Sequence, residues 1–137
     1  MVDEPPSAPS GSAPRDLATL RAALAAFNRE RDWEQFHRPR DLAMALSVEA
    51  GELLELFLWK ADDAAPERAR LREELGDVLI CLVNLAARLD VDLLDAAYDK
   101  LANNARKYPV AAARGNAKKW DELAPGAPDA TAPEDDR

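Results

Sequence analysis

The sequence is poor in the residues that build disulfides and histidine-based metal sites. It holds one cysteine, Cys81, and one histidine, His37, in 137 residues. A single cysteine excludes an internal disulfide and is consistent with the reducing cytoplasm, where we expect the protein. This content also excludes the usual Cys and His ligands of zinc and the two Glu-x-x-His pairs of a ferritin-like di-iron site.

Aromatic residues, positive charge and long apolar runs are also scarce. Aromatics make up 6% of the chain, and much of the 47% apolar content is alanine and leucine, which favours helices over strands. The net charge of −8 argues against binding to a nucleic-acid polymer. Because no apolar run is long enough to span a membrane and no secretory signal begins the chain, we expect no membrane association.

Both ends of the chain lack apolar periodicity. Residues 1–14 are rich in Pro, Ser, Ala and Gly, and residues 121–137 are similar with added acidic residues. Such compositions are typical of solvated, disordered tails. The remaining residues, 15–120, have the length of one domain with its own core.

Between the tails, apolar residues recur at helical spacing in four segments, which predicts an all-α, four-helix bundle. We expect helices over about residues 15–31, 40–59, 66–89 and 91–108. The irregular connection after the first segment contains Trp33, Phe36 and His37. These side chains either plug the core or form a platform for a flat ligand, and His37 could be purely structural.

Four acids occupy matching positions on the second and third predicted helices. Glu49 and Glu52 form one pair, and Glu74 and Asp77 form the other. In an antiparallel hairpin, residues at one level have a constant index sum. Glu49 with Asp77 and Glu52 with Glu74 satisfy this condition, at levels about 4.5 Å apart. Glu55 does not satisfy this condition, because the residue at the same level of the partner helix is Leu71 rather than an acid. We therefore expect Glu55 to be solvated or peripheral to the site.

Converging carboxylates repel one another unless a cation neutralises them or their pKa values rise. An all-oxygen set favours Mg²⁺, with Mn²⁺ as the alternative. Solvated helix faces also produce Glu-x-x-Glu pairs, so the alternative to a metal site is an ordinary acidic surface. The matched levels and the neighbouring apolar seams favour the metal site. A separate polar face with Lys100, Asn104 and Lys107 on the fourth helix could contact phosphates or could simply be solvated.

Several motifs together resemble the dCTP pyrophosphatases, which belong to the all-α NTP pyrophosphatase (MazG-like) superfamily. The resemblance covers about residues 17–109. It rests on Trp-Glu-Gln-Phe-His at 33–37, Glu-Ala-Gly-Glu at 49–52, Phe-Leu-Trp-Lys at 57–60, Glu-Glu-Leu-Gly-Asp at 73–77 and Lys-Tyr-Pro at 107–109.

The resemblance implies Mg²⁺-dependent cleavage of a (deoxy)nucleoside triphosphate, dCTP or a modified dCTP, to the monophosphate and pyrophosphate in a homotetramer. It implies metal ligation by Glu49, Glu52, Glu74 and Asp77. The implied nucleotide-binding residues are Trp33, Glu34, Gln35, Phe36, His37, Trp59, Lys100 and Asn104, and we add Cys81, a small packed residue lining the site. Cys81 and Leu24 depart from the tyrosine and histidine of the eukaryotic relatives, which bears on base preference.

Two alternatives stay open at this point. A pyrophosphatase of the same kind could act on another nucleotide, such as dUTP or an oxidised purine triphosphate. A non-catalytic helical module for oligomerisation or nucleotide sensing would need the bundle but not the four acids.

Overall fold

A computed structural model describes residues 14–61 and 64–123, in which every regular element is a helix. This confirms the all-α prediction for the described part of the chain. The predicted tails lie almost wholly outside the described residues. None of the described helices combines the length and the apolar character needed to cross a membrane. The elements are α1 (Leu17–Glu30), α2 (Pro39–Glu55), α3 (Arg68–Arg88), α4 (Leu93–Lys107) and α5 (Val110–Ala113), with 3₁₀ turns at Glu34–Phe36 and Trp120–Glu122.

Local chemistry explains where the helices begin. The Asp16 side chain accepts a hydrogen bond from Thr19 N at 2.8 Å and caps α1. Of the two acids considered for the start of α4, Asp92 is the cap, and its carboxylate accepts from the backbone of Leu94 and Asp95. Such caps satisfy amide groups that have no partner inside the helix.

The predicted extension of the second helix to residue 59 is wrong, because α2 ends at Glu55. The following amides bond three residues back rather than four, as in Phe57 N to Leu54 O at 3.0 Å. Trp59 then adopts a φ of 58°, a left-handed conformation that a helix cannot continue. The aromatic end of this segment is therefore a turn.

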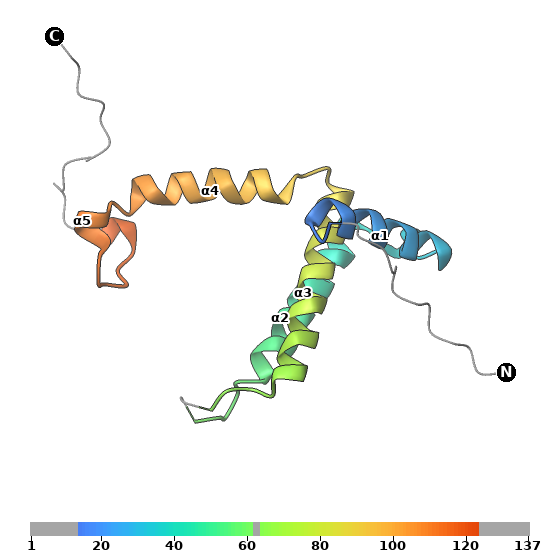
Figure 1. Cartoon of the computed structure of the whole chain (residues 1–137), viewed down its shortest axis with the longest axis horizontal. Helices are drawn as coiled ribbons and strands as arrows, with labels where there is room; N and C mark the ends of the chain where they lie inside the picture. The colour runs from blue at the N-terminus through green and yellow to red at the C-terminus, as the bar shows by residue number, and fades with distance from the viewer. Residues whose placement is uncertain (1–13, 62–63, 124–137) are drawn as a thin grey trace, which may run out of the picture. The chain divides into compact units, whose positions relative to one another are not determined.

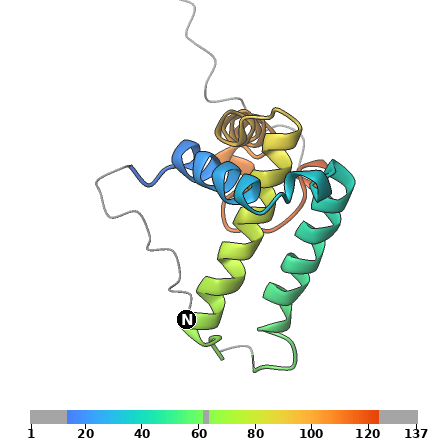
Figure 2. The same cartoon turned by 90° about the vertical axis from the view of Figure 1, so that its right-hand side faces the viewer.

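Helices α2 and α3 lie side by side as an antiparallel hairpin, and α1 crosses the end of the hairpin that is far from its loop (Figure 1, Figure 2). These three helices belong to one compact unit that ends at Val91, and a second unit begins at Asp92. The buried apolar residues belong to the first unit: Leu42, Leu56, Val83 and Ala86.

The first unit leaves much of its apolar surface uncovered. Leu75, Leu82 and Leu89, which the sequence pattern places on one seam of α3, are 50%, 36% and 54% exposed. Within the second unit, the apolar face of α4 with Leu94, Tyr98 and Leu101 is also exposed. No described side chain is completely buried.

Candidate metal and nucleotide site

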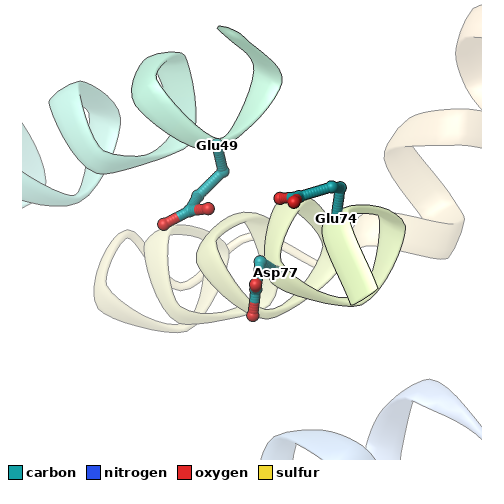
Figure 3. A group of neighbouring side chains, drawn as sticks. All are labelled: Glu49, Glu74 and Asp77. Atoms are coloured by element: carbon teal, nitrogen blue, oxygen red, sulfur yellow. The ribbon is translucent and has the colours of Figure 1, made fainter. Parts of the chain in front are cut away.

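Three acidic side chains meet between α2 and α3. Glu49, Glu74 and Asp77 each offer a carboxylate oxygen, and the three oxygen atoms lie within 4.8 Å of one another. Figure 3 shows Glu49 projecting from α2 toward α3, the helix that carries Glu74 and Asp77. The antiparallel register predicted from the index sums therefore brings Glu49 and Asp77 together.

The charges of this acidic cluster, Glu49, Glu74 and Asp77, are only partly compensated. Glu74 is buried, at 6% exposure, and its Oε1 atom lies 3.5 Å from Arg70 Nη2. Burial raises the pKa of Glu49, and the negative charges of Glu52, Asp77 and Glu74 raise it further. One arginine does not neutralise three carboxylates, so the cluster is a place where a cation is electrostatically favoured.

The donor set fits a hard divalent cation. All three groups supply oxygen, the ligand type that Mg²⁺ and Mn²⁺ prefer, and they come from two packed helices rather than from a mobile loop. The clustered oxygen atoms and the buried position of Glu74 distinguish this arrangement from an ordinary solvated acidic face.

The fourth acid of the motif, Glu52, and the excluded Glu55 are not part of the cluster. Glu52 is exposed and is not among the three residues whose oxygen atoms converge, although its charge acts on Glu49. Glu55 is exposed at the last residue of α2. The four-acid set predicted from spacing is thus present as three converging side chains and one neighbour.

A cavity of about 560 Å³ adjoins the acidic cluster and is mostly apolar. Burial raises the pKa of the Cys81 thiol in its wall, with further contributions from the Glu49 and Asp77 charges. The volume falls in the range of small-molecule sites. Lining residues are contributed by α1 (Leu20, Ala23, Leu24, Phe27, Asn28), by the connection (Trp33, Phe36, His37), by α2 (Asp41, Leu42, Ala45, Glu49) and by α3 (Asp77, Ile80, Cys81, Asn84).

The aromatic connection forms one side of this cavity. The rings of Phe27 and Trp33 meet edge to face with centroids 5.7 Å apart, and the Arg31 guanidinium lies 3.6 Å from the Phe27 centroid. Trp33 and Phe36 remain 45% and 63% exposed, so they are not core plugs in the isolated chain. Aromatic faces left open beside a cavity are suited to stacking on a flat ligand.

The remaining predicted nucleotide-binding residues are not among the lining residues. Gln35 donates instead to the backbone oxygen and the carboxylate of Asp32, at 2.9 and 2.8 Å. Glu34 borders a second cavity of about 230 Å³. Trp59 is 95% exposed in the turn after α2. Lys100 and Asn104 lie on α4, in the second unit.

Sequence reasoning missed two asparagines in the cavity wall. Asn28 is 6% exposed, and its Nδ2 donates to Asn84 Oδ1 at 3.0 Å. Both residues interrupt otherwise apolar helix faces: Asn28 follows Leu24 by four residues, and Asn84 follows Cys81 by three. A polar residue in register with Asp77 and Cys81 was the signal that could have revealed this pair.

Comparison with known proteins gives a consistent result. The family model of the MazG-like family matches residues 44–123. The dCTP pyrophosphatase 1 of Bos taurus is 51% identical over 118 residues, covering 81% of this chain and 70% of the relative. The human protein of the same name is 52% identical over 118 residues, covering 81% and 69%.

A solved structure shares the fold. The crystal structure of a pyrophosphatase from Archaeoglobus fulgidus superposes with a TM-score of 0.66 at 30% identity, covering 74% of this chain and 99% of that one. The family model covers more than half of the chain, and the relatives match 81% of it at 51–52% identity. By these measures the chain belongs to the MazG-like family.

Proposed function

We propose that this protein is a nucleoside triphosphate pyrophosphohydrolase that converts dCTP, or a modified dCTP, to dCMP and pyrophosphate. The observation that carries the proposal is the acidic cluster beside a mostly apolar cavity of nucleoside size. Relatives named dCTP pyrophosphatase 1, which are 51–52% identical over 81% of this chain, support it.

The acidic residues are proposed to hold Mg²⁺, with Mn²⁺ as a substitute. Glu49, Glu74 and Asp77 are the converging ligands, and Glu52 is the fourth ligand of the motif. When bound, the ion supplies positive charge that neutralises the phosphates and favours an activated water. The burial of Glu74 and its ion pair with Arg70 hold one carboxylate in place before the cation binds.

The cavity is proposed to hold the nucleoside. Trp33 and Phe36 offer ring faces for stacking, and His37 and Cys81 complete the wall beside the acids. The apolar lining keeps water away from the base, which leaves the phosphates to project toward the carboxylates. Glu34 and Gln35 belong to the same connection and are proposed to position it.

The remaining predicted contacts concern Trp59, Lys100 and Asn104, and their roles stay predictions. The nearly full exposure of Trp59 is consistent with contact to another copy of the chain. We propose a homotetramer in the cytoplasm, supported by the exposed apolar seam of α3 and the exposed face of α4.

A panel of nucleoside triphosphates with Mg²⁺ tests the proposal, with pyrophosphate and orthophosphate measured separately. We expect pyrophosphate as the primary product and dCTP as a preferred substrate. Primary release of orthophosphate would exclude cleavage between the α and β phosphates. Efficient turnover restricted to dUTP or an oxidised purine triphosphate would assign the chain to a different substrate. Asp77→Asn should abolish turnover while the protein stays folded, which a non-catalytic module would not predict.

A further inference from the structure

The part-buried pair of Asn28 and Asn84 lines both the larger and the smaller cavity. Along α3, Asp77, Cys81 and Asn84 follow one another at spacings of four and three residues, so they share one helix face. Asn84 therefore lies about 10 Å from Asp77 along the axis. This span is comparable to the distance from the α-phosphate of a nucleotide to the far edge of its base.

The cavity walls contributed by α2 and α1 can be followed in the same direction as the face of α3, from the acidic cluster toward the asparagine pair. On α2, Glu49 is followed toward the same end by Ala45 and Leu42, which are small or apolar. On α1, Leu20 and Leu24 precede Asn28 at intervals of four residues on the cavity side. Apart from the two asparagines, the polar side chains that these helices contribute to the cavity wall are Asp41, Glu49 and Asp77. Of these acids, Asp41 is next to Leu42 in sequence and lies toward the asparagine end. The other lining residues of the three helices are apolar or Cys81.

The hydrogen bond between the two amides leaves one carbonyl oxygen, that of Asn28, and three N–H groups, one of Asn28 and two of Asn84, without a partner. Each amide has a carbonyl oxygen and two N–H groups, and the bond from Asn28 Nδ2 to Asn84 Oδ1 uses one group of each residue. No other described residue bonds to Asn28 Oδ1 or to Asn84 Nδ2. Among the described residues no polar side-chain atom is both buried and unpaired, so the unpaired atoms of this pair retain accessible surface at the boundary of the two cavities.

We propose that Asn28 and Asn84 together read the polar edge of the base and select a 4-aminopyrimidine. The inference rests on the proposed function, because it places the nucleoside in this cavity. The free Asn28 oxygen accepts from the exocyclic amine, and the free Asn84 amide donates to the adjacent ring nitrogen. A 4-oxo base would set its oxygen against the Asn28 oxygen unless both amides turned over together.

The pair is suited to this role by its rigidity. Asn28 is held by the bond to Asn84 and by its backbone oxygen, which accepts from Trp33 N at 2.9 Å. The same residue thus anchors the aromatic connection that stacks on the base. A site built to hydrogen-bond a substrate group rejects analogues that lack it, because its buried polar atoms are then left unpaired.

The test compares dCTP with its 2-pyrimidinone analogue, which lacks the 4-amino group, and with dUTP. Both Asn28→Ala and Asn84→Ala should lower kcat/KM for dCTP about tenfold, the effect of losing one neutral hydrogen bond. Asn28→Ala, which removes the acceptor for the amine, should change kcat/KM for the pyrimidinone nucleotide less than about twofold, so that the preference for the amino group disappears. Asn84→Ala should lower kcat/KM for both nucleotides, because the analogue keeps the ring nitrogen to which Asn84 donates. The double variant Asn28→Ala/Asn84→Ala removes both amides, so that neither is left without its partner. It serves as the test protein if a single variant misfolds.

Arg21→Ala is the matched control, since Arg21 is exposed on the same helix as Asn28 and borders only the smaller cavity. It should keep the wild-type preference. Equal losses for dCTP and the pyrimidinone analogue in Asn28→Ala would indicate a structural role and overturn the inference. Unchanged turnover of dCTP would overturn it as well.

Binding separates this inference from the proposed function. The dissociation constant of the α,β-imido analogue of dCTP, measured by calorimetry with Mg²⁺, should rise about tenfold in the asparagine variants. Wild-type protein that binds this analogue but releases no pyrophosphate from dCTP would refute the proposed function and leave the base contact standing. Wild-type protein that binds it no better than the imido analogue of dUTP would refute the selection of a 4-amino group.

Discussion

Glu49→Gln should stabilise the metal-free protein and abolish most of its response to Mg²⁺. The substitution keeps the shape of the side chain and removes one of three charges whose oxygen atoms lie within 4.8 Å of one another. Two unit charges at that distance repel by about 1 kcal/mol in water and about 3 kcal/mol at an effective dielectric constant of about 20.

The stabilisation from Glu49→Gln is smaller than the summed repulsion of Glu49 with the other two carboxylates. Glu49 is only half-buried, and Arg70 already offsets part of the negative charge at Glu74. We expect a free energy of unfolding about 1–2 kcal/mol above that of the wild type in EDTA, or a Tm higher by roughly 5–10 °C. With Mg²⁺ at about 100 times its Kd, the wild type should gain about 2.7 kcal/mol and the variant far less. The order of stability therefore reverses between the two conditions.

Differential scanning calorimetry in EDTA and in Mg²⁺ measures both effects. The pKa of Glu49 is raised in the folded state, so the folded protein binds more protons than the unfolded chain in that pH range. The stability of the metal-free wild type should consequently rise as the pH falls from neutral through the Glu49 pKa, and this slope should be weaker in Glu49→Gln.

Glu55→Gln provides the control, because it removes an equivalent charge from the same helix outside the acidic cluster. A Glu49→Gln protein that is less stable than the wild type in EDTA, or that matches Glu55→Gln in both conditions, would refute the electrostatic reasoning.

Three further predictions concern packing, capping and thiol reactivity. Val83 is 4% exposed, so Val83→Ala should lower the free energy of unfolding by about 2 kcal/mol, read as a lower urea midpoint with an unchanged m-value. Asp92→Ala removes the side chain that accepts from two amides at the start of α4 and should destabilise that helix by about 1 kcal/mol, seen as faster amide hydrogen exchange in its first turn. The raised pKa of Cys81 should make its alkylation by iodoacetamide at pH 8 severalfold slower than that of free cysteine, and Glu49→Gln should speed it by removing a nearby charge. A Cys81 thiol as reactive as free cysteine would contradict the last expectation.

Much of the fold and half of the site could be predicted because they depend on spacing along single helices. The 3.6-residue period predicts the helices, and the antiparallel register follows from a short connection between two of them. The convergence of Glu49 with Asp77 is a consequence of that register alone. Composition excluded zinc and di-iron centres without reference to any coordinates.

The limits of prediction appear where residues far apart in the chain meet. The end of α2 at Glu55 depends on turn hydrogen bonds and on the backbone of Trp59, which apolar periodicity does not report. The index sum pairs Glu52 with Glu74, yet Glu52 is exposed and is not among the residues whose oxygen atoms converge.

The sequence by itself determined the helical class, the acidic hairpin and the family, since these are written in local spacing and in contiguous motifs. Only the tertiary structure decided that α1 crosses the hairpin and brings Asn28 against Asn84 across 56 residues of chain. The physical reason is that a pattern reports which face of a helix is apolar but not which partner covers it. The pair forms only where α1 and α3 meet, because neither helix by itself shows that its asparagine has a hydrogen-bonding partner on the other.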